Sequence, residues 1–289
     1  MRARHWMTMA GFALTCGALM ACNGSSSDDD MPGAGGDGSS AGSSSSSGGT
    51  DSGSAGADEG VGGADQSAGG RGGTGVCEVD TSYMPEIDPA NFVEGVDNPY
   101  WPLPPGAKWV YEAADEYVEV EVTDLSKEIL GVPVVVVRDT VRASAADPDI
   151  IEDTYDWYAQ DQDGNVWYMG EDTKEYEGGV VVSTEGSWEA GVDGAQPGIV
   201  MHAMPPAAGE PYRQEYYACE AEDYAEIVST AEMVSVPFGD YEDCIQTREF
   251  TPLEPDVNEY KYYCAGVGLV QEVDVADGDG IKLTSMTVP

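Results

Sequence analysis

Positive charge is scarce in this chain. Only 12 of its 289 residues are Lys or Arg, against 54 Asp and Glu, which gives a formal charge of −42 at pH 7. Proteins that bind nucleic acid need a basic surface, so this composition excludes that class of partner. The same charge disfavours contact with anionic lipid headgroups, so attachment to a membrane has to come from an anchor. Cations would be attracted instead, and the simplest role of the acidic surface is to keep the protein soluble.

Histidine is scarcer still, and the motifs of common catalytic sites are missing. The chain has two His, and only His202 lies beyond the first 21 residues. Residues 77–289 contain no G-x-S-x-G, no H-E-x-x-H and no C-x-x-C, so the sequence nominates no catalytic residue, no metal site and no cofactor. Residues 161–165 place acids around Gly164, but an EF-hand loop has its Gly at position six rather than four. A hairpin turn is expected there.

Aromatic residues are absent from positions 23–76. This stretch has 18 Gly and 13 Ser among 54 residues, and so little apolar surface cannot offset the entropy cost of ordering the chain. Residues 22–76 are therefore expected to be a lipidated Cys followed by a disordered linker. Residues 77–289 contain most of the aromatics, and their length suits one domain.

The longest apolar run is Trp6 to Leu19, which follows the basic residues Arg2 and Arg4. Its 14 residues are too few to span a bilayer, which takes about 20, and fit a signal peptide over residues 1–21. The following residues, Leu19-Met20-Ala21-Cys22, resemble the lipobox of bacterial lipoproteins. That resemblance implies cleavage before Cys22 and acylation of Cys22, with the lipid as the sole contact with the membrane. The expected location is the bacterial cell envelope, and Asn23 in place of an Asp favours the outer membrane.

Four cysteines remain in the domain, namely Cys77, Cys219, Cys244 and Cys264. An even number in an exported chain favours disulfides. We expect Cys219 to pair with Cys264, because the residues before each read as neighbouring strand ends, and Cys77 to pair with Cys244.

Alternating and β-branched segments dominate residues 77–289 and predict an all-β domain. Residues 117–122 alternate charged residues with valine, and residues 132–137 are a valine run interrupted by Pro133. Turn signals recur throughout, and the one helix-like window is 218–229. The expected architecture is a mostly antiparallel curved sheet or open barrel.

Four residues are candidates for ligand contacts. Trp157 and Trp167 flank the 161–165 turn, and adjacent strand residues face opposite sides, so some of the aromatics here could form an exposed platform. Arg213 is one of few basic residues, and an internal carboxylate is its expected partner. His202 is the sole His of the exported part, and an ordinary loop or strand role is expected for it.

Several phrases between residues 97 and 275 occur together in this order: NPYWPL at 98–103, PGAKWVY at 105–111, WYAQD at 157–161, GNVWY at 164–168, SWEAG at 187–191, PGIVM at 197–201, YRQEY at 212–216, TPLEP at 251–255 and GVGLV at 266–270. In them the chain resembles a broad group of functionally uncharacterised bacterial secreted proteins and lipoproteins. The resemblance implies no catalytic signature, and a curved antiparallel sheet like that of lipoprotein carriers, which wrap around apolar ligands. His202, Cys219 and Cys264 depart from the usual residues of that group.

The expected function is that of a lipid-anchored, non-catalytic binding module, whose partner is an apolar small molecule or another component of the envelope. A structural or adhesive surface module is the alternative. A carbohydrate hydrolase that uses two carboxylates is the third class, but 46 acids in the domain nominate no pair. The sequence leaves the oligomeric state open.

Overall fold

The computed structural model describes residues 79–289, which fold as a 16-stranded antiparallel sheet. The prediction of an all-β domain with a curved antiparallel sheet is confirmed. The predicted signal peptide, Cys22, the linker and Cys77 lie outside the described residues. Within residues 79–289, no helix combines the length and the apolar character that crossing a bilayer requires.

The elements follow the chain in this order: η1 (Pro89–Asn91), β1 (Phe92–Val93), β2 (Lys108–Glu112), β3 (Tyr117–Ile129), β4 (Val132–Arg142), β5 (Glu152–Asp161), β6 (Val166–Glu177), β7 (Val180–Ser183), β8 (Trp188–Glu189), β9 (Gln196–Met201), β10 (Tyr212–Arg213), β11 (Glu215–Tyr216), β12 (Tyr224–Val236), β13 (Gly239–Phe250), β14 (Asn258–Cys264), β15 (Gly268–Asp274) and β16 (Lys282–Thr287).

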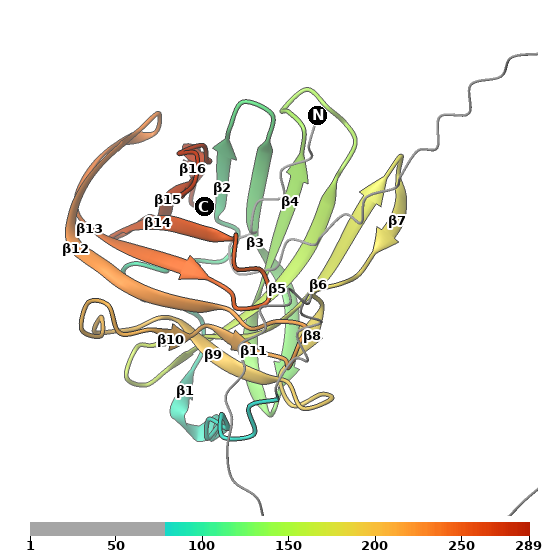
Figure 1. Cartoon of the computed structure of the whole chain (residues 1–289), viewed down its shortest axis with the longest axis vertical. Coiled ribbons are helices and arrows are strands. Elements are labelled where there is room, and N and C mark those ends of the chain that lie inside the picture. Colours follow the sequence, from blue (N-terminus) through green and yellow to red (C-terminus); the bar gives the residue numbers. More distant parts are fainter. Residues whose placement is uncertain (1–78) are drawn as a thin grey trace, which may run out of the picture. The chain divides into compact units, whose positions relative to one another are not determined.

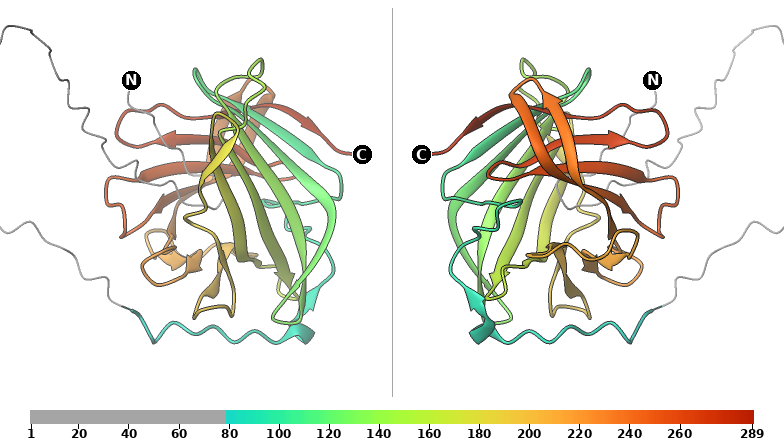
Figure 2. Two further views of the ribbon diagram at one scale, coloured as in Figure 1. Left: turned by 90° about the vertical axis from the view of Figure 1, so that its right-hand side faces the viewer. Right: turned by 90° about the vertical axis from the view of Figure 1, so that its left-hand side faces the viewer.

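Hairpins build most of the sheet, and one long-range pairing completes it. The strand order is β10-β12-β13-β14-β15-β16-β2-β3-β4-β5-β6-β9-β11, with β1 beside β5 and with β7 and β8 beside β6. The pairing of β16 with β2 brings the C-terminal strand against the first long strand of the domain. In Figures 1 and 2, β3 to β6 form one curved wall, and β12 to β15 form a second wall whose strands run in a different direction.

One short segment connects the two ends of this strand order. Strands β10 and β11 are consecutive in the chain and are separated only by Gln214. Tyr212 pairs with Ala225 on β12, and Glu215 pairs with Pro197 on β9. At Gly198 a Cβ atom would meet the backbone of Gln214 well inside contact distance, so glycine is required there. Residues 212–216 therefore connect the two ends of the strand order, because β10 pairs with β12 and β11 pairs with β9.

The disulfide pairing differs from the sequence prediction. Cys244 on β13 is bonded to Cys264 on β14, with 4.4 Å between the Cα atoms, and Cys219 is disulfide-bonded as well. The expected Cys219–Cys264 and Cys77–Cys244 pairs are wrong. The strand before Cys219 pairs with β9, whereas β14 lies beside the strand that carries Cys244, so Cys219 and Cys264 do not end neighbouring strands.

Candidate functional site

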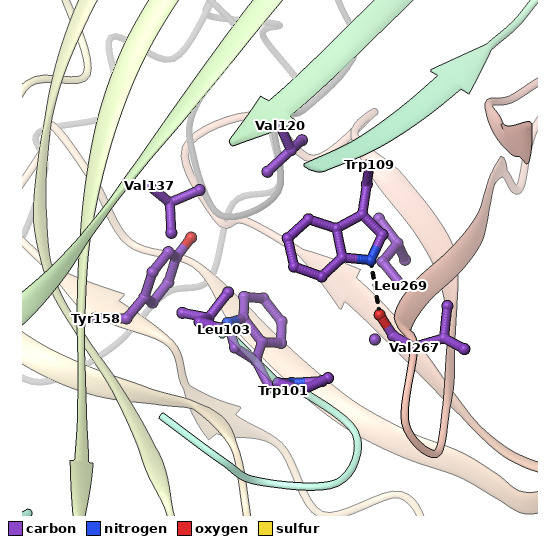
Figure 3. Close-up of a pocket in the computed structure, with 10 residues that line it drawn as sticks. Trp101, Leu103, Trp109, Val120, Val137, Tyr158, Val267 and Leu269 are labelled. Carbon is purple, nitrogen blue, oxygen red and sulfur yellow. Dashed lines mark hydrogen bonds between the residues drawn. The ribbon is translucent and has the colours of Figure 1, made fainter. Parts of the chain in front are cut away.

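A small apolar pocket lies inside the curve of the sheet (Figure 3). Its volume is about 20 Å³, which is room for a water-sized molecule. Three aromatic rings define it, those of Trp101, Trp109 and Tyr158, and all three side chains are buried. The other lining residues are Pro102, Leu103, Val120, Val137, Val267, Gly268 and Leu269.

Strand register places the wall of this pocket. Trp109 on β2 is opposite Val120 on β3, so both side chains point to one face of the sheet. The indole Nε1 of Trp109 donates a hydrogen bond to the carbonyl oxygen of Val267 at 2.9 Å, which fixes the ring over the pocket (Figure 3).

A proline-rich segment, residues 98–105, fills one side of the pocket, and we call it the plug. It contains four prolines and belongs to no strand, yet it buries Trp101 and Leu103 in the interior. The ring of Trp101 lies 5.4 Å, centroid to centroid, from both Tyr158 and Tyr263. The plug is therefore an irregular segment that takes the place of core side chains.

Hydrogen bonds hold the start of the plug. The backbone N–H of Asn98 donates to Gln160 Oε1 at 2.8 Å, and the Asn98 side-chain amide donates to the carbonyl of Gly164 at 2.9 Å. The N–H of Leu103 donates to the carbonyl of Val96 at 3.0 Å. Prolines allow few alternative backbone conformations, so the plug is stiff between these attachments.

A larger groove lies on the other side of the plug. Its volume is about 830 Å³, and twelve of its 22 lining residues are Val, Leu or Pro. Pro102 and Leu103 line both the groove and the inner pocket. The plug is thus the partition between them.

Carboxylates occupy the interior beyond the pocket. Asp139 lies opposite Val120 and two residues after Val137, so it shares their face of the sheet. Asp156 is opposite Val137, and Glu171 is opposite Asp156 on the next strand. All three acids are buried. Asp156 Oδ1 accepts a hydrogen bond from the hydroxyl of Tyr168 at 2.7 Å, and Glu171 Oε2 accepts one from the hydroxyl of Thr173 at 2.7 Å.

Lys261 provides the positive charge of this interior. Its Nζ atom lies 3.2 Å from Glu249 Oε2, 3.3 Å from Glu272 Oε2 and 3.9 Å from Glu259 Oε2. Burial lowers the pKa of Lys261, but the charges of these three carboxylates outweigh burial and raise it. Among residues 79–289, no other Lys or Arg is buried.

Burial dominates the titration of the interior acids, because a carboxylate loses its hydration there. It raises the pKa of Asp156 to about 7, against the lowering effect of the Tyr168 hydrogen bond. The pKa of Asp139 lies well above its usual range, first through burial and then through the charge of Asp156. Burial and the charge of Asp156 likewise raise the pKa of Glu171. Near neutral pH burial therefore favours the protonated form of Asp139 and Glu171, and Asp156 is partly protonated.

The structure separates the residues predicted to contact a ligand. Trp157 is buried beneath the ammonium group of Lys127, which lies 3.6 Å from the ring centroid, so it is no exposed platform. Trp167 donates from Nε1 to Asp161 Oδ2 at 2.8 Å and packs edge-on against Phe92. Neither tryptophan lines the inner pocket.

Arg213 and His202 both lie next to Tyr212 but do not share a site. Arg213 donates to Asp80 Oδ2 at 3.0 Å, and its guanidinium lies 4.5 Å from the ring centroid of Tyr216. His202 packs edge-on against Tyr212, and burial lowers its pKa. The expected carboxylate partner of Arg213 is thus present.

Sequence reasoning missed the interior acids and the plug. Asp139 lies two residues after the four-valine run 134–137 on β4, and its position in the alternation was the available signal that it faces inward. Among residues 79–289, no group of three or more His, Cys, Asp or Glu is arranged to hold a metal ion. The 161–165 turn is a hairpin, closed by the N–H of Asp161 bonding to the carbonyl of Asn165.

Comparisons with known proteins add little to this geometry. No protein-family model matches the chain, and no curated protein matches it. A solved structure, described as a "putative lipoprotein from Parabacteroides distasonis ATCC 8503", is similar at 11% sequence identity. The match covers 65% of this chain and 98% of that chain, with a TM-score of 0.31.

Proposed function

We propose that this chain is a lipid-anchored protein of the bacterial cell envelope whose β domain binds an apolar ligand without catalysing a reaction. The lipobox-like residues ending at Cys22 support the anchor. The pocket and groove on either side of the plug support the binding role. The outer membrane is the proposed location, because Asn23 follows the anchor residue.

The shared lining of the two spaces is the observation on which the binding role depends. Because Pro102 and Leu103 border both, displacement of the plug joins the inner pocket to the groove. The groove already has the volume of a small-molecule site, about 300–1,000 Å³, and its apolar lining suits a hydrocarbon chain. While the plug is in place, Trp101 and Leu103 occupy the space that a ligand takes when the plug is displaced.

Native mass spectrometry tests the binding role. The chain from residue 23 onward is exported by a cleavable signal and purified from an oxidising compartment without denaturant. We expect an adduct of lipid-like mass that leaves on gentle activation. Leu103→Trp fills the partition and should abolish the adduct, whereas Val181→Trp, on exposed β7, should retain it. A bare polypeptide mass, less four hydrogens for two disulfides, contradicts the binding role and favours a structural or adhesive module.

Membrane fractionation tests the anchor separately. Cys22→Ser should release the protein from the membrane fraction and remove the acyl mass from its N-terminal peptide. Cys16→Ser, within the predicted signal peptide, is the matched control and should leave both unchanged. A Cys22→Ser variant that stays in the membrane fraction contradicts the anchor.

The interior carboxylates do not favour a hydrolase. Asp156 and Glu171 lie opposite one another on β5 and β6, but both are fully buried and the pocket beside them admits only a water-sized molecule. With the plug in place, a sugar ring has no path to such a pair.

A further inference from the structure

Polar atoms without partners lie next to the inner pocket. Tyr158 lines the pocket, is 1% exposed, and its hydroxyl has no hydrogen-bond partner within residues 79–289. Figure 3 shows this hydroxyl directed toward Val137 and Val120. The pocket lining is thus apolar except for the Tyr158 hydroxyl, which has no hydrogen-bond partner among the described residues.

Asp139 continues this polar side. It is opposite Val120, is 1% exposed, and neither of its carboxyl oxygens has a partner among the described residues. Asp156, opposite Val137, has one partnered oxygen and one, Oδ2, without a partner. A buried polar atom without a partner costs free energy, so these four oxygens together indicate a missing hydrogen-bond partner.

The surroundings restrict what that partner is. Residues 79–289 contain no cluster of His, Cys, Asp and Glu suited to a metal ion. Asp139 lies between Val120 on β3 and the buried Thr154 on β5, whose hydroxyl is already bonded to Glu152 and Thr173. Lys261 is already engaged by Glu249 and Glu272. An ammonium group supplies three N–H donors and a positive charge, and it tolerates apolar neighbours when it ends a hydrocarbon chain.

Resting on the proposed binding role, we infer that the ligand is an amphiphilic amine. Its hydrocarbon chain replaces Trp101 and Leu103 against Trp109. Its ammonium group is bound by Tyr158, Asp139 and Asp156, and the two carboxyls release to solvent the protons that they retain in the free protein. The acidic surface draws cations toward the protein, which speeds capture of such a molecule.

Three eight-carbon probes separate the contribution of the ammonium group to binding from that of the hydrocarbon chain. Octylamine, octanol and octanoate are titrated into the chain from residue 23 onward, freed of co-purified lipid, by isothermal titration calorimetry at pH 7.5. We expect octylamine to bind about tenfold more tightly than octanol, the size of one charge-assisted hydrogen bond, and octanoate to bind most weakly. Adding 0.5 M NaCl should leave this order unchanged, because the group is buried.

A variant that cannot form the carboxylate assigns the preference to the interior. Asp139→Asn should reduce the octylamine preference to within about twofold of octanol while octanol affinity stays the same. Asp172→Asn removes one charge at an exposed position on β6 and should keep the full preference. If Asp139→Asn does not fold, Asp156→Asn is measured in its place.

The outcomes distinguish failure of the amine assignment from failure of the proposed binding role. Equal binding of octanol and octylamine, or a preference that survives Asp139→Asn, overturns the amine assignment and leaves the apolar pocket standing. Binding of none of the three probes overturns both.

Discussion

Lys261 and Glu272 face one another across β14 and β15, with 3.3 Å between Nζ and Oε2 and with both side chains almost completely buried. Glu249 approaches the same ammonium group from β13 at 3.2 Å. One lysine thus offsets the charge of carboxylates from three strands, and the wall formed by β13 to β15 depends on it.

Removing this lysine should destabilise the domain strongly. Lys261→Met leaves buried carboxylates without a counter-charge, and we expect a loss of about 3–5 kcal/mol in the free energy of unfolding, measured with urea. Lys174→Met removes an exposed ion pair with Asp172 and should cost no more than about 1 kcal/mol. Similar losses for the two variants would contradict a central role for Lys261.

Stability should fall as pH rises from about 4 to 8. Four buried carboxyls and the half-buried Glu152 have a pKa raised above the usual 3.8 or 4.5, chiefly by loss of hydration: to about 7 for Asp156, Asp223 and Glu272, and to about 8 for Glu116 and Glu152. Between the unfolded and folded pKa values the folded state binds more protons, so unfolding becomes easier with increasing pH. Below pH 4 both states are protonated and this dependence disappears.

Urea unfolding at half-unit steps of pH measures this slope. Each such carboxyl contributes up to about 1.4 kcal/mol per pH unit, so a slope steeper than about 1 kcal/mol per unit is expected between pH 5 and 7. Repeating the series in 0.5 M NaCl separates the buried groups from surface repulsion, which salt screens. A flat profile in high salt would show that the interior acids do not retain protons.

Loss of the Cys244–Cys264 disulfide should lower stability by about 3 kcal/mol, because it closes a loop of about 20 residues. The double variant Cys244→Ala, Cys264→Ala tests this by thermal and urea unfolding. Non-reducing peptide mapping of the wild type should recover this pair and should find Cys219 in a second disulfide-linked peptide. A Cys219–Cys264 peptide would contradict the structure.

Substitution at Gly198 should weaken the segment that joins the two ends of the sheet. Gly198→Ala places a Cβ against the backbone of Gln214, and we expect a loss of about 1–3 kcal/mol. At Gly239 the nearest atom to an added Cβ is the flexible hydroxyl end of Tyr241, so Gly239→Ala should be close to neutral. Hydrogen exchange of residues 212–216 should accelerate in the first variant only.

The sequence predicted the strands better than the site. Segments 117–122 and 132–137, expected as strands from their alternation and their valines, form the beginnings of β3 and β4, which continue to Ile129 and Arg142. The YRQEY phrase at 212–216 gives no sign that it divides at Gln214, where each half pairs with a different partner. The helix-like window at 218–229 runs into β12 instead, where pairing with β13 overrides the helix propensity of its Ala and Glu residues.

The interior acids could not be identified from the sequence, because their surroundings depend on strands far apart in the chain. Asp139 reads as one of many charged residues until β3 and β5 are placed beside it. The plug gives no periodic signal at all, and only its prolines and Trp101 mark it as unusual.

The N-terminal end of the described chain is attached close to the joint of the sheet. The N–H of Asp80 donates to the hydroxyl of Tyr216, the Asp80 carboxylate bonds Arg213, and the hydroxyl of Tyr83 donates to the carbonyl of Pro197. Tension applied through the residues before Asp80 therefore reaches the domain at the segment that holds its two ends together. When the protein is pulled through its N-terminal tether, the force acts first on residues 212–216. The resistance of the domain to mechanical unfolding is therefore set by this segment rather than by the end of any strand.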